Sequence, residues 1–268
     1  MEDVEAFTFS GVRSIMGALV LLPVILIKDG IEGRRMSAAL KAERKAETKR
    51  SVLYGCVLGV FLCIATNFQQ FAFYYSTSGK IAFVTALYMF FVPIFGLFMR
   101  KRLPWLTWLS VALGFLGLFM LCVNPAELSN VNKGGLLSVA CAFFFAFHIL
   151  FIEKFAPKAD GIKLSCTQFA VSGIISCVLM LVFETPSIAE IKNAAVPLMY
   201  SGIMSCGIAY TFQIIGQKHT EATVASLIMC MESVFGVLCG ALILQERMKG
   251  REIAGCVIMF CAILLSQS

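Results

Sequence analysis

Nine long apolar blocks constrain the fold of this chain more than any other feature of its sequence. Most approach the ~20 residues that a helix needs to cross ~30 Å of hydrocarbon at ~1.5 Å per residue. They do not alternate apolar and polar residues as membrane β-strands do, and helices satisfy their own backbone hydrogen bonds in lipid. The sequence therefore predicts an all-α integral membrane protein with nine transmembrane helices. The blocks are 7–27, 52–75, 79–99, 104–123, 134–152, 164–183, 196–215, 221–244 and 251–266.

Composition argues against a soluble functional domain. Hydrophobic residues make up 59% of the chain and charged residues 14%, whereas soluble domains average about 45–50% apolar and about 25% charged residues. The longest connection, 28–50, is charged, is expected to be amphipathic and is too short for a soluble domain. We expect no nucleic-acid partner, because the net charge of +6 follows membrane topology. The sequence has no Walker A loop, and we predict neither enzymatic activity nor a cofactor.

The cysteines do not form a recognisable ligand pattern. Eleven are present, no two have Cys-x-x-Cys spacing, and most lie inside the apolar blocks. Small polarizable side chains of this kind pack readily between helices. We therefore predict no metal site and no disulfide framework.

Lysine and arginine are distributed unevenly over the connections. The connection 28–50 carries eight of them, and such residues concentrate on the cytoplasmic side of a membrane. Placing it inside puts fifteen basic residues inside and six outside, with Arg13 left within a helix. We therefore expect a multi-pass protein of the cytoplasmic membrane with its C-terminus in the cytoplasm. The N-terminus is then external, which suggests that a preceding helix is missing from this chain.

The second half of the chain echoes the first. FVPIFG at 91–96 aligns with MESVFG at 231–236, and residues 110–117 align with 255–262. The helix sets that contain these segments begin on opposite sides of the membrane. Inverted repeats of this kind are typical of secondary transporters, whose substrate sites lie near the midplane. The alternative is a chance match between apolar segments.

Motifs spread along the whole chain point to a known family. They are FTFSGVR (7–13), TALYMFFVP (85–93), FAFHILFIEKFA (145–156) with QF (168–169), AYTFQIIGQKHTEATVASLIMCMESVFG (209–236) and LQERM (244–248). Together they resemble the EamA-like family of the drug/metabolite transporter superfamily.

The resemblance implies ten helices in two inverted five-helix repeats and transport of small metabolites, often outward. On this basis residues 1–125 form a first EamA-like repeat of four helices, which lacks its first helix. Residues 134–268 form a second repeat of five helices. The family's usual Glu-Pro of the ninth helix is Glu232-Ser233 here, which keeps the carboxylate and alters a kink.

Two charged residues within the apolar blocks are candidates for function, because charge is costly inside a bilayer. Glu232 lies in the middle of its block and should be protonated, paired or facing water. It either couples protons or binds a cationic group, or else makes a buried structural hydrogen bond. Arg13 either snorkels to the surface, attracts an anionic solute or pairs with Glu232.

Amides and a phenol form a second set of candidates on two corresponding helices. Asn67 and Gln70 lie deep in one helix, and Tyr210, Gln213 and Gln217 share a face of the other. Such groups either line a wet cavity or join helices through hydrogen bonds worth ~0.6 kcal/mol each. We favour the cavity, because both equivalent helices carry a cluster.

Three further residues complete the predicted substrate pathway. His148 either relays protons near neutral pH or donates to a backbone carbonyl. Thr85 and Tyr88 lie one turn apart, and we expect them to face the same cavity. Two small-residue pairs, Gly55–Gly59 and Gly236–Gly240, predict close contacts between helices.

The leading hypothesis is a secondary carrier that moves amino acids or related small metabolites outward by alternating access, with proton coupling as an open option. A passive channel is the first alternative, but its helices should carry a continuous polar stripe rather than mid-membrane clusters. A membrane scaffold is the second alternative, and it needs no such clusters. The expected partners are a small-molecule substrate and the lipid bilayer, and a homodimer is left open.

Overall fold

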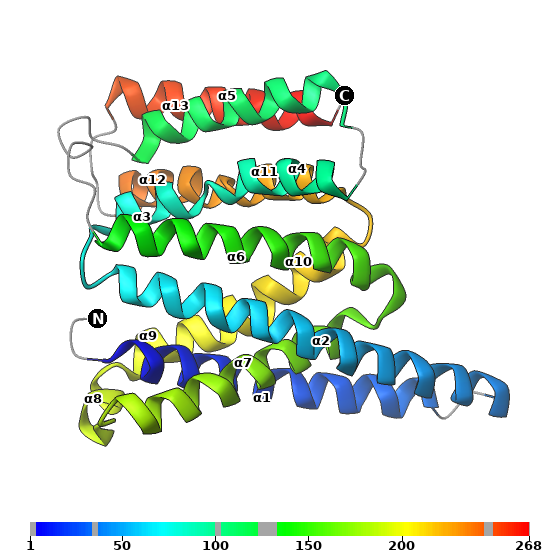
Figure 1. Cartoon of the computed structure of the whole chain (residues 1–268). Helices are drawn as coiled ribbons and strands as arrows, with labels where there is room; N and C mark the ends of the chain where they lie inside the picture. The colour runs from blue at the N-terminus through cyan, green and yellow to red at the C-terminus, as the bar shows by residue number, and fades with distance from the viewer. Residues whose placement is uncertain (1–3, 34–36, 100–102, 123–132, 244–248, 268) are drawn as a thin grey trace. The chain divides into compact units, whose positions relative to one another are not determined.

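The computed structural model describes residues 4–33, 37–99, 103–122, 133–243 and 249–267, and the regular elements within these ranges are helical (Figure 1). The first half contains α1 (Ala6–Gly33), α2 (Ala38–Ala72), α3 (Ser78–Thr85), α4 (Tyr88–Phe98) and α5 (Trp105–Cys122). The second half contains α6 (Lys133–Phe155), η2 (Ala156–Lys158), α7 (Gly161–Phe183), α8 (Ile188–Asn193), α9 (Ala195–Tyr200), η3 (Ser201–Ala209), α10 (Tyr210–Gln217), α11 (Ala222–Met229), α12 (Met231–Ile243) and α13 (Gly250–Ser266).

Eight helical segments within the described ranges are long and apolar enough to cross a membrane. They correspond to the first eight predicted blocks, and the ninth is the 17-residue α13. The predicted all-α membrane fold is therefore confirmed. Parts of the predicted pattern, namely the basic residues at 34–35, 100–102 and 247 and the LQERM motif, lie outside the described residues.

The charged connection 28–50 is largely helical, which the hydropathy pattern did not predict. Helix α1 continues to Gly33, and α2 already begins at Ala38. The Arg44 guanidinium holds the two extensions together, because it lies 2.6 Å from an Asp29 oxygen and 2.7 Å from a Glu32 oxygen. Charged side chains placed on two facing helices thus replace the apolar contacts that hold the membrane segments together.

The chain forms two compact units, each of which contains helices from both halves of the sequence. Unit 1 comprises residues 1–70 and 151–219, and unit 2 comprises 71–150 and 220–268. The predicted repeats, by contrast, divide the chain between its two halves, and they stay a prediction.

Glycines allow the helices of unit 1 to approach closely. A Cβ on Gly11 of α1 would lie 2.9 Å from the Cys177 sulfur of α7. On α2, a Cβ on Gly55 would lie 2.6 Å from Thr167 Cβ, and one on Gly59 would lie 2.7 Å from the Gln168 carbonyl oxygen. The predicted close contact at Gly55 and Gly59 is therefore confirmed, and α7 is the partner helix.

Carboxylates fix both ends of α7. At its start, Asp160 accepts hydrogen bonds from the backbone N–H groups of Ile162 and Lys163, and its other oxygen lies 2.7 Å from Lys28 Nζ. Burial alone would raise the pKa of the Asp160 carboxyl, but the hydrogen bond from Lys28 and those from the backbone lower that pKa below its usual value. Just after the end of α7, Glu184 accepts the backbone N–H groups of Phe7 and Thr8 and so caps α1.

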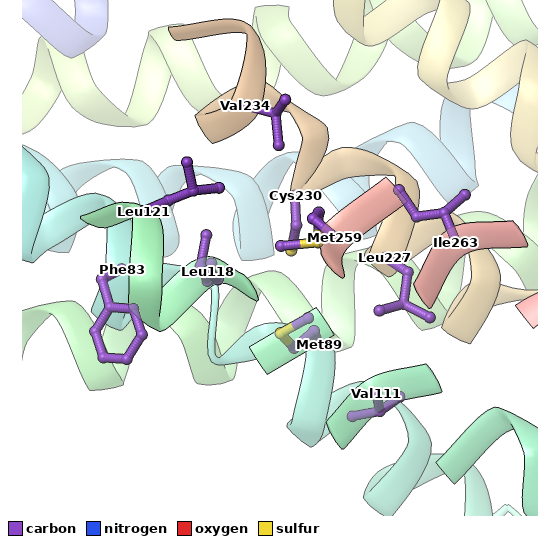
Figure 2. Close-up of a cluster of buried hydrophobic side chains, with 11 residues drawn as sticks. Phe83, Met89, Val111, Leu118, Leu121, Leu227, Cys230, Val234, Met259 and Ile263 are labelled. Atoms are coloured by element: carbon purple, nitrogen blue, oxygen red, sulfur yellow. The ribbon is translucent and has the colours of Figure 1, made fainter. Parts of the chain in front are cut away.

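Unit 2 is built around the contact between α5 and α13 and a buried cluster beside it. A Cβ on Gly117 would lie 2.9 Å from the Gly255 carbonyl oxygen, and one on Gly255 would lie 2.8 Å from that of Gly117. Figure 2 shows the cluster, in which Cys230 and Leu227 lie near Met259. The predicted contact at Gly236 is wrong, because no described atom beyond its chain neighbours and its own helix backbone lies within 4 Å of its Cβ position, and the surroundings of Gly240 lie outside the description.

Three predicted membrane helices are not continuous α-helices. The block 79–99 consists of α3 and α4, and the block 221–244 consists of α11 and α12. In the block 196–215, a nine-residue π-helix, η3, separates α9 from α10. Departures of this kind from the α-helical ladder often mark functional sites.

Candidate functional site

The two interrupted helices of unit 2 meet near their breaks. Helix α3 ends at Thr85 and α4 begins at Tyr88, while Cys230 separates α11 from α12. The Cys230 thiol donates to the Tyr88 hydroxyl over 3.7 Å. Two membrane helices therefore change their backbone geometry at neighbouring positions, which places the Tyr88 and Cys230 side chains in contact.

Backbone hydrogen bonds at both breaks are tightened toward the i→i−3 type. Leu87 N–H donates to the Val84 carbonyl over 3.1 Å, and Cys230 N–H lies 3.1 Å from the Leu227 carbonyl. Pro93 then removes a further donor inside α4, because proline has no N–H to continue the helical ladder. Each break is thus a local turn within an otherwise helical segment, and the segment continues as a helix on the other side of the turn.

Thr85 and Tyr88 lie on opposite sides of the first break. Thr85 is 5% exposed, and its hydroxyl has no hydrogen-bond partner among the described residues. Tyr88 is half-buried, and its ring packs edge-on against Phe145 at 6.4 Å between centroids. The first break therefore has one buried hydroxyl, that of Thr85, without a hydrogen-bond partner among the described residues. It also has one phenol, that of Tyr88, which contacts Cys230 of the second interrupted helix.

Glu232 does not lie in the middle of a helix, as the apolar block suggested. It is the second residue of α12, because the helix is interrupted at Cys230. Its side chain is exposed, and it makes no hydrogen bond or ion pair within the described part of the chain. A carboxylate in the first turn of a helix lies where the helix dipole favours negative charge.

His148 lies within α6 and is completely buried in unit 2. Its ring is edge-on to that of Phe145, with 6.4 Å between centroids. Phe145 also contacts Tyr88, so the three rings form a chain from α6 to α4. This arrangement gives His148 a packing role and leaves the predicted proton relay untested.

In unit 1, Asn67 joins α2 to α7. Its amide nitrogen donates to the Cys63 carbonyl oxygen over 2.8 Å and to the Ser176 hydroxyl over 2.9 Å. The amide oxygen of Asn67 is buried without a partner among the described residues. Gln70, almost one turn further along α2, is half-buried. Sequence reasoning missed Ser176, although Ser172 and Ser176 are four apart and both buried.

The residues of the predicted polar face of α10 differ in burial, and Gln217 is the most buried of them. The Tyr210 ring packs edge-on against Phe169 with 5.3 Å between centroids, and Gln213 is half-buried. Gln217 is 3% exposed, and neither polar atom of its amide has a partner among the described residues. Because a π-helix precedes α10, the direction of this face could not be derived from α-helical spacing alone.

Arg13 lies over an aromatic ring of its own helix. Its guanidinium carbon is 5.3 Å from the centroid of Phe9, one turn earlier on α1. A cation over an aromatic face is stabilised by the ring quadrupole. The contact gives Arg13 a local structural partner, and the predicted charge role is untested.

The predicted site residues thus fall into two groups that the structure describes separately. Unit 2 contains Thr85, Tyr88, His148 and Glu232, of which Tyr88 and His148 both contact Phe145. Unit 1 contains Arg13, Asn67, Gln70, Tyr210, Gln213 and Gln217.

Comparison with known proteins identifies the family. A model of the EamA-like transporter family matches residues 1–123 and again residues 132–267. The chain belongs to the EamA-like transporter family. It is therefore a membrane transporter of the drug/metabolite type, a class whose members are generally not enzymes.

Relatives of this EamA-like chain extend over nearly its whole length. It is 22% identical over 269 residues to an "Uncharacterized transporter" of Archaeoglobus fulgidus, covering 99% of this chain and 78% of that protein. It is 23% identical to the "Uncharacterized transporter YoaV" of Bacillus subtilis, covering 99% and 88%. It is also 26% identical to "Protein PecM" of Dickeya dadantii, covering 81% and 72%.

A solved crystal structure supports the fold of the EamA-like chain. It superposes with a TM-score of 0.76 at 17% sequence identity, covering 98% of this chain and 87% of the other. At this level of identity, the similarity establishes the fold alone.

Proposed function

We propose that this protein is a secondary transporter that moves small organic metabolites outward across the cytoplasmic membrane by alternating access. The observation that carries the proposal is the meeting of two interrupted membrane helices through Tyr88 and Cys230. In secondary transporters, discontinuous helices supply the polar groups that bind substrates and coupling ions within the membrane. Membership of a transporter family supports the same class of function.

The chemistry around the breaks suits a zwitterion such as an amino acid. Glu232 supplies an exposed carboxylate for a cationic group. Thr85 supplies a buried hydroxyl that forms no hydrogen bond with any described residue. The Tyr88 hydroxyl can both donate and accept.

Glu232 is also the proposed carrier of a coupling proton. A carboxylate in a membrane span changes its charge when it takes up a proton, so its protonation alters the cost of exposing it to either side. Glu232→Gln removes that change while keeping the size of the side chain. If protons drive transport, this variant should lose the dependence of transport on a pH gradient.

The test is metabolite profiling of spent medium from cells that make the wild-type protein, Glu232→Gln or Glu221→Gln. Glu221 is the matched control, because it is an exposed acid that precedes α11 and makes no side-chain capping bond. The proposal predicts that a small set of metabolites accumulates outside with the wild type and the control only. Media that match across all strains would count against export.

Counterflow in proteoliposomes separates a carrier from a passive channel. A carrier exchanges labelled for unlabelled substrate and saturates, whereas a channel shows neither behaviour. Saturable counterflow of a metabolite identified in the medium is therefore the expected result. Linear, non-saturating flux would favour the channel instead.

A further inference from the structure

A charged cavity lies in unit 1 where five of its membrane helices end. It has a volume of about 530 Å³, within the ~300–1,000 Å³ range of small-molecule sites. Its walls come from the end of α1, the start of α2, η2 after α6, the start of α7 and the end of α10. Exposed Leu40 and Ile215 stand among the charged groups of the lining. Because these helix ends adjoin candidate membrane spans, we expect the cavity at the boundary between hydrocarbon and water.

Ion pairs already satisfy part of the charge in this cavity. Lys28 is paired with Asp160 at 2.7 Å, and Arg44 is paired with Asp29 and Glu32 at 2.6 and 2.7 Å. These pairs fix the walls of the cavity. Other charged residues of the lining make no ion pair among the described residues: Glu43, Glu47, Arg50, Lys158 and Lys218.

The free groups carry both signs of charge and come from three parts of unit 1. Glu43, Glu47 and Arg50 recur at helical spacing along one face of α2. Lys158 ends η2, and Lys218 directly follows α10. The Lys218 Cε atom lies 3.8 Å from the Cβ position of Gly161, at the start of α7. The cavity therefore presents three cations and two carboxylates to a single occupant.

We propose that this cavity binds the phosphoethanolamine headgroup of a membrane lipid. Arg50, Lys158 and Lys218 would hold the phosphate through charge-assisted hydrogen bonds. Glu43 and Glu47 would accept hydrogen bonds from the ammonium group. Basic pockets at the cytoplasmic ends of membrane helices are suited to lipid headgroups, and the positive-inside pattern predicts that this end is cytoplasmic.

The free carboxylates decide between headgroups. An anionic glycerol headgroup brings phosphate but no cation, so Glu43 and Glu47 would remain unpaired beside a negative charge. A choline headgroup brings a quaternary ammonium, which cannot donate a hydrogen bond. A primary ammonium satisfies both carboxylates, and Ile215, within the candidate span Ala195–Gln217, provides apolar surface for the attached acyl chains.

The experiment measures lipid binding to the purified full chain by native mass spectrometry and thermal shift. Phosphatidylethanolamine, phosphatidylglycerol and phosphatidylcholine are added separately, with free phosphoethanolamine in a fourth arm. We expect phosphatidylethanolamine to bind at least about tenfold more tightly than the other three, which corresponds to one good charged hydrogen bond. Equal binding of the three lipids, tighter binding of phosphatidylglycerol, or free phosphoethanolamine binding as tightly as the lipid would overturn the proposal.

Variants locate the binding. The double variant Lys158→Gln/Lys218→Gln should weaken binding of all phospholipids at least about tenfold, whereas Glu47→Gln should remove the preference for phosphatidylethanolamine over phosphatidylcholine. Lys192→Gln and Glu190→Gln on α8 are matched controls outside the cavity. Unchanged lipid affinity of the double lysine variant, or an unchanged preference for phosphatidylethanolamine in Glu47→Gln, would contradict the assignment, even if the wild type binds phosphatidylethanolamine. Thermal unfolding without lipid shows whether each variant is folded.

Discussion

The two units hold their helices together in different ways. In unit 1, hydrogen bonds join polar side chains of different helices. The Asn67 amide donates to the Ser176 hydroxyl over 2.9 Å, and the Thr211 hydroxyl donates to the Ser165 hydroxyl over 2.8 Å. In unit 2, the two interrupted helices share the long contact between Cys230 and Tyr88, and Thr85 and Glu232 lie beside them without partners among the described residues. We infer that these pairs stabilise the helix packing of unit 1, where the Gln217 amide, unpaired among the described residues, is an exception, and that the polar groups at the breaks of unit 2 are available to a substrate.

The largest effect on stability should come from the close contacts of unit 1. Gly59→Ala places a methyl group 2.7 Å from a carbonyl oxygen of α7. We expect a loss of about 1–3 kcal/mol from the resulting overpacking, measured by thermal unfolding of the protein in detergent. Gly30→Ala is the control, because no described atom lies within 4 Å of its Cβ position. It should leave the protein as stable or slightly more so.

Loss of the Asp160 carboxylate should come next. Asp160→Asn removes the ion pair with Lys28 and the negative charge at the start of α7, while the amide oxygen can still cap the helix, and we expect a cost of about 1 kcal/mol at neutral pH. Because the folded-state pKa of Asp160 is lowered, its contribution is present above the ordinary Asp pKa and is lost as the pH falls through the lowered value.

Thermal unfolding between neutral pH and about pH 3 tests this sign. The difference between wild type and Asp160→Asn should shrink toward zero at the acid end. The matched Glu190→Gln variant on α8 should show little difference from wild type at neutral pH. A wild-type advantage that grows on acidification would contradict the assignment of Asp160.

The smallest effects distinguish the polar groups of the two units. Ser176→Ala removes the hydrogen bond from Asn67 and the weaker contact with the Cys63 thiol, both between α2 and α7, and should cost ~0.6 kcal/mol. Thr85→Val removes a buried hydroxyl that has no partner among the described residues, so stability should be unchanged or slightly higher. A larger stability loss for Thr85→Val than for Ser176→Ala would contradict the contrast between the units.

The sequence predicted the membrane spans well, because apolar length alone determines them. It also predicted the close approach at Gly55 and Gly59, since small residues four apart share a helix face. It did not predict the breaks at Leu87 and Cys230, where the apolar pattern continues without a glycine or proline. Hydropathy records only the preference for lipid, so it cannot distinguish a continuous helix from one with a tightened turn.

The candidate site was predictable only residue by residue. The free-energy cost of placing polar or charged side chains in a bilayer indicated Glu232 and Asn67 as candidates, and both lie within the described residues. The partners were not predictable, because the pairing of Asn67 with Ser176 joins residues 109 positions apart. The position of Glu232 in the first turn of α12 likewise depends on the break at Cys230, which the neighbouring residues in the sequence do not predict.

One paired measurement tests the contrast between the units most directly. Substrate counterflow in proteoliposomes and thermal unfolding are compared for Glu232→Gln in unit 2 and Ser176→Ala in unit 1. The account predicts that Glu232→Gln loses at least about tenfold in transport rate, equivalent to about 1.4 kcal/mol, with unfolding unchanged. It predicts that Ser176→Ala unfolds slightly earlier and transports at the wild-type rate. Full transport by Glu232→Gln together with loss of transport by Ser176→Ala would contradict it.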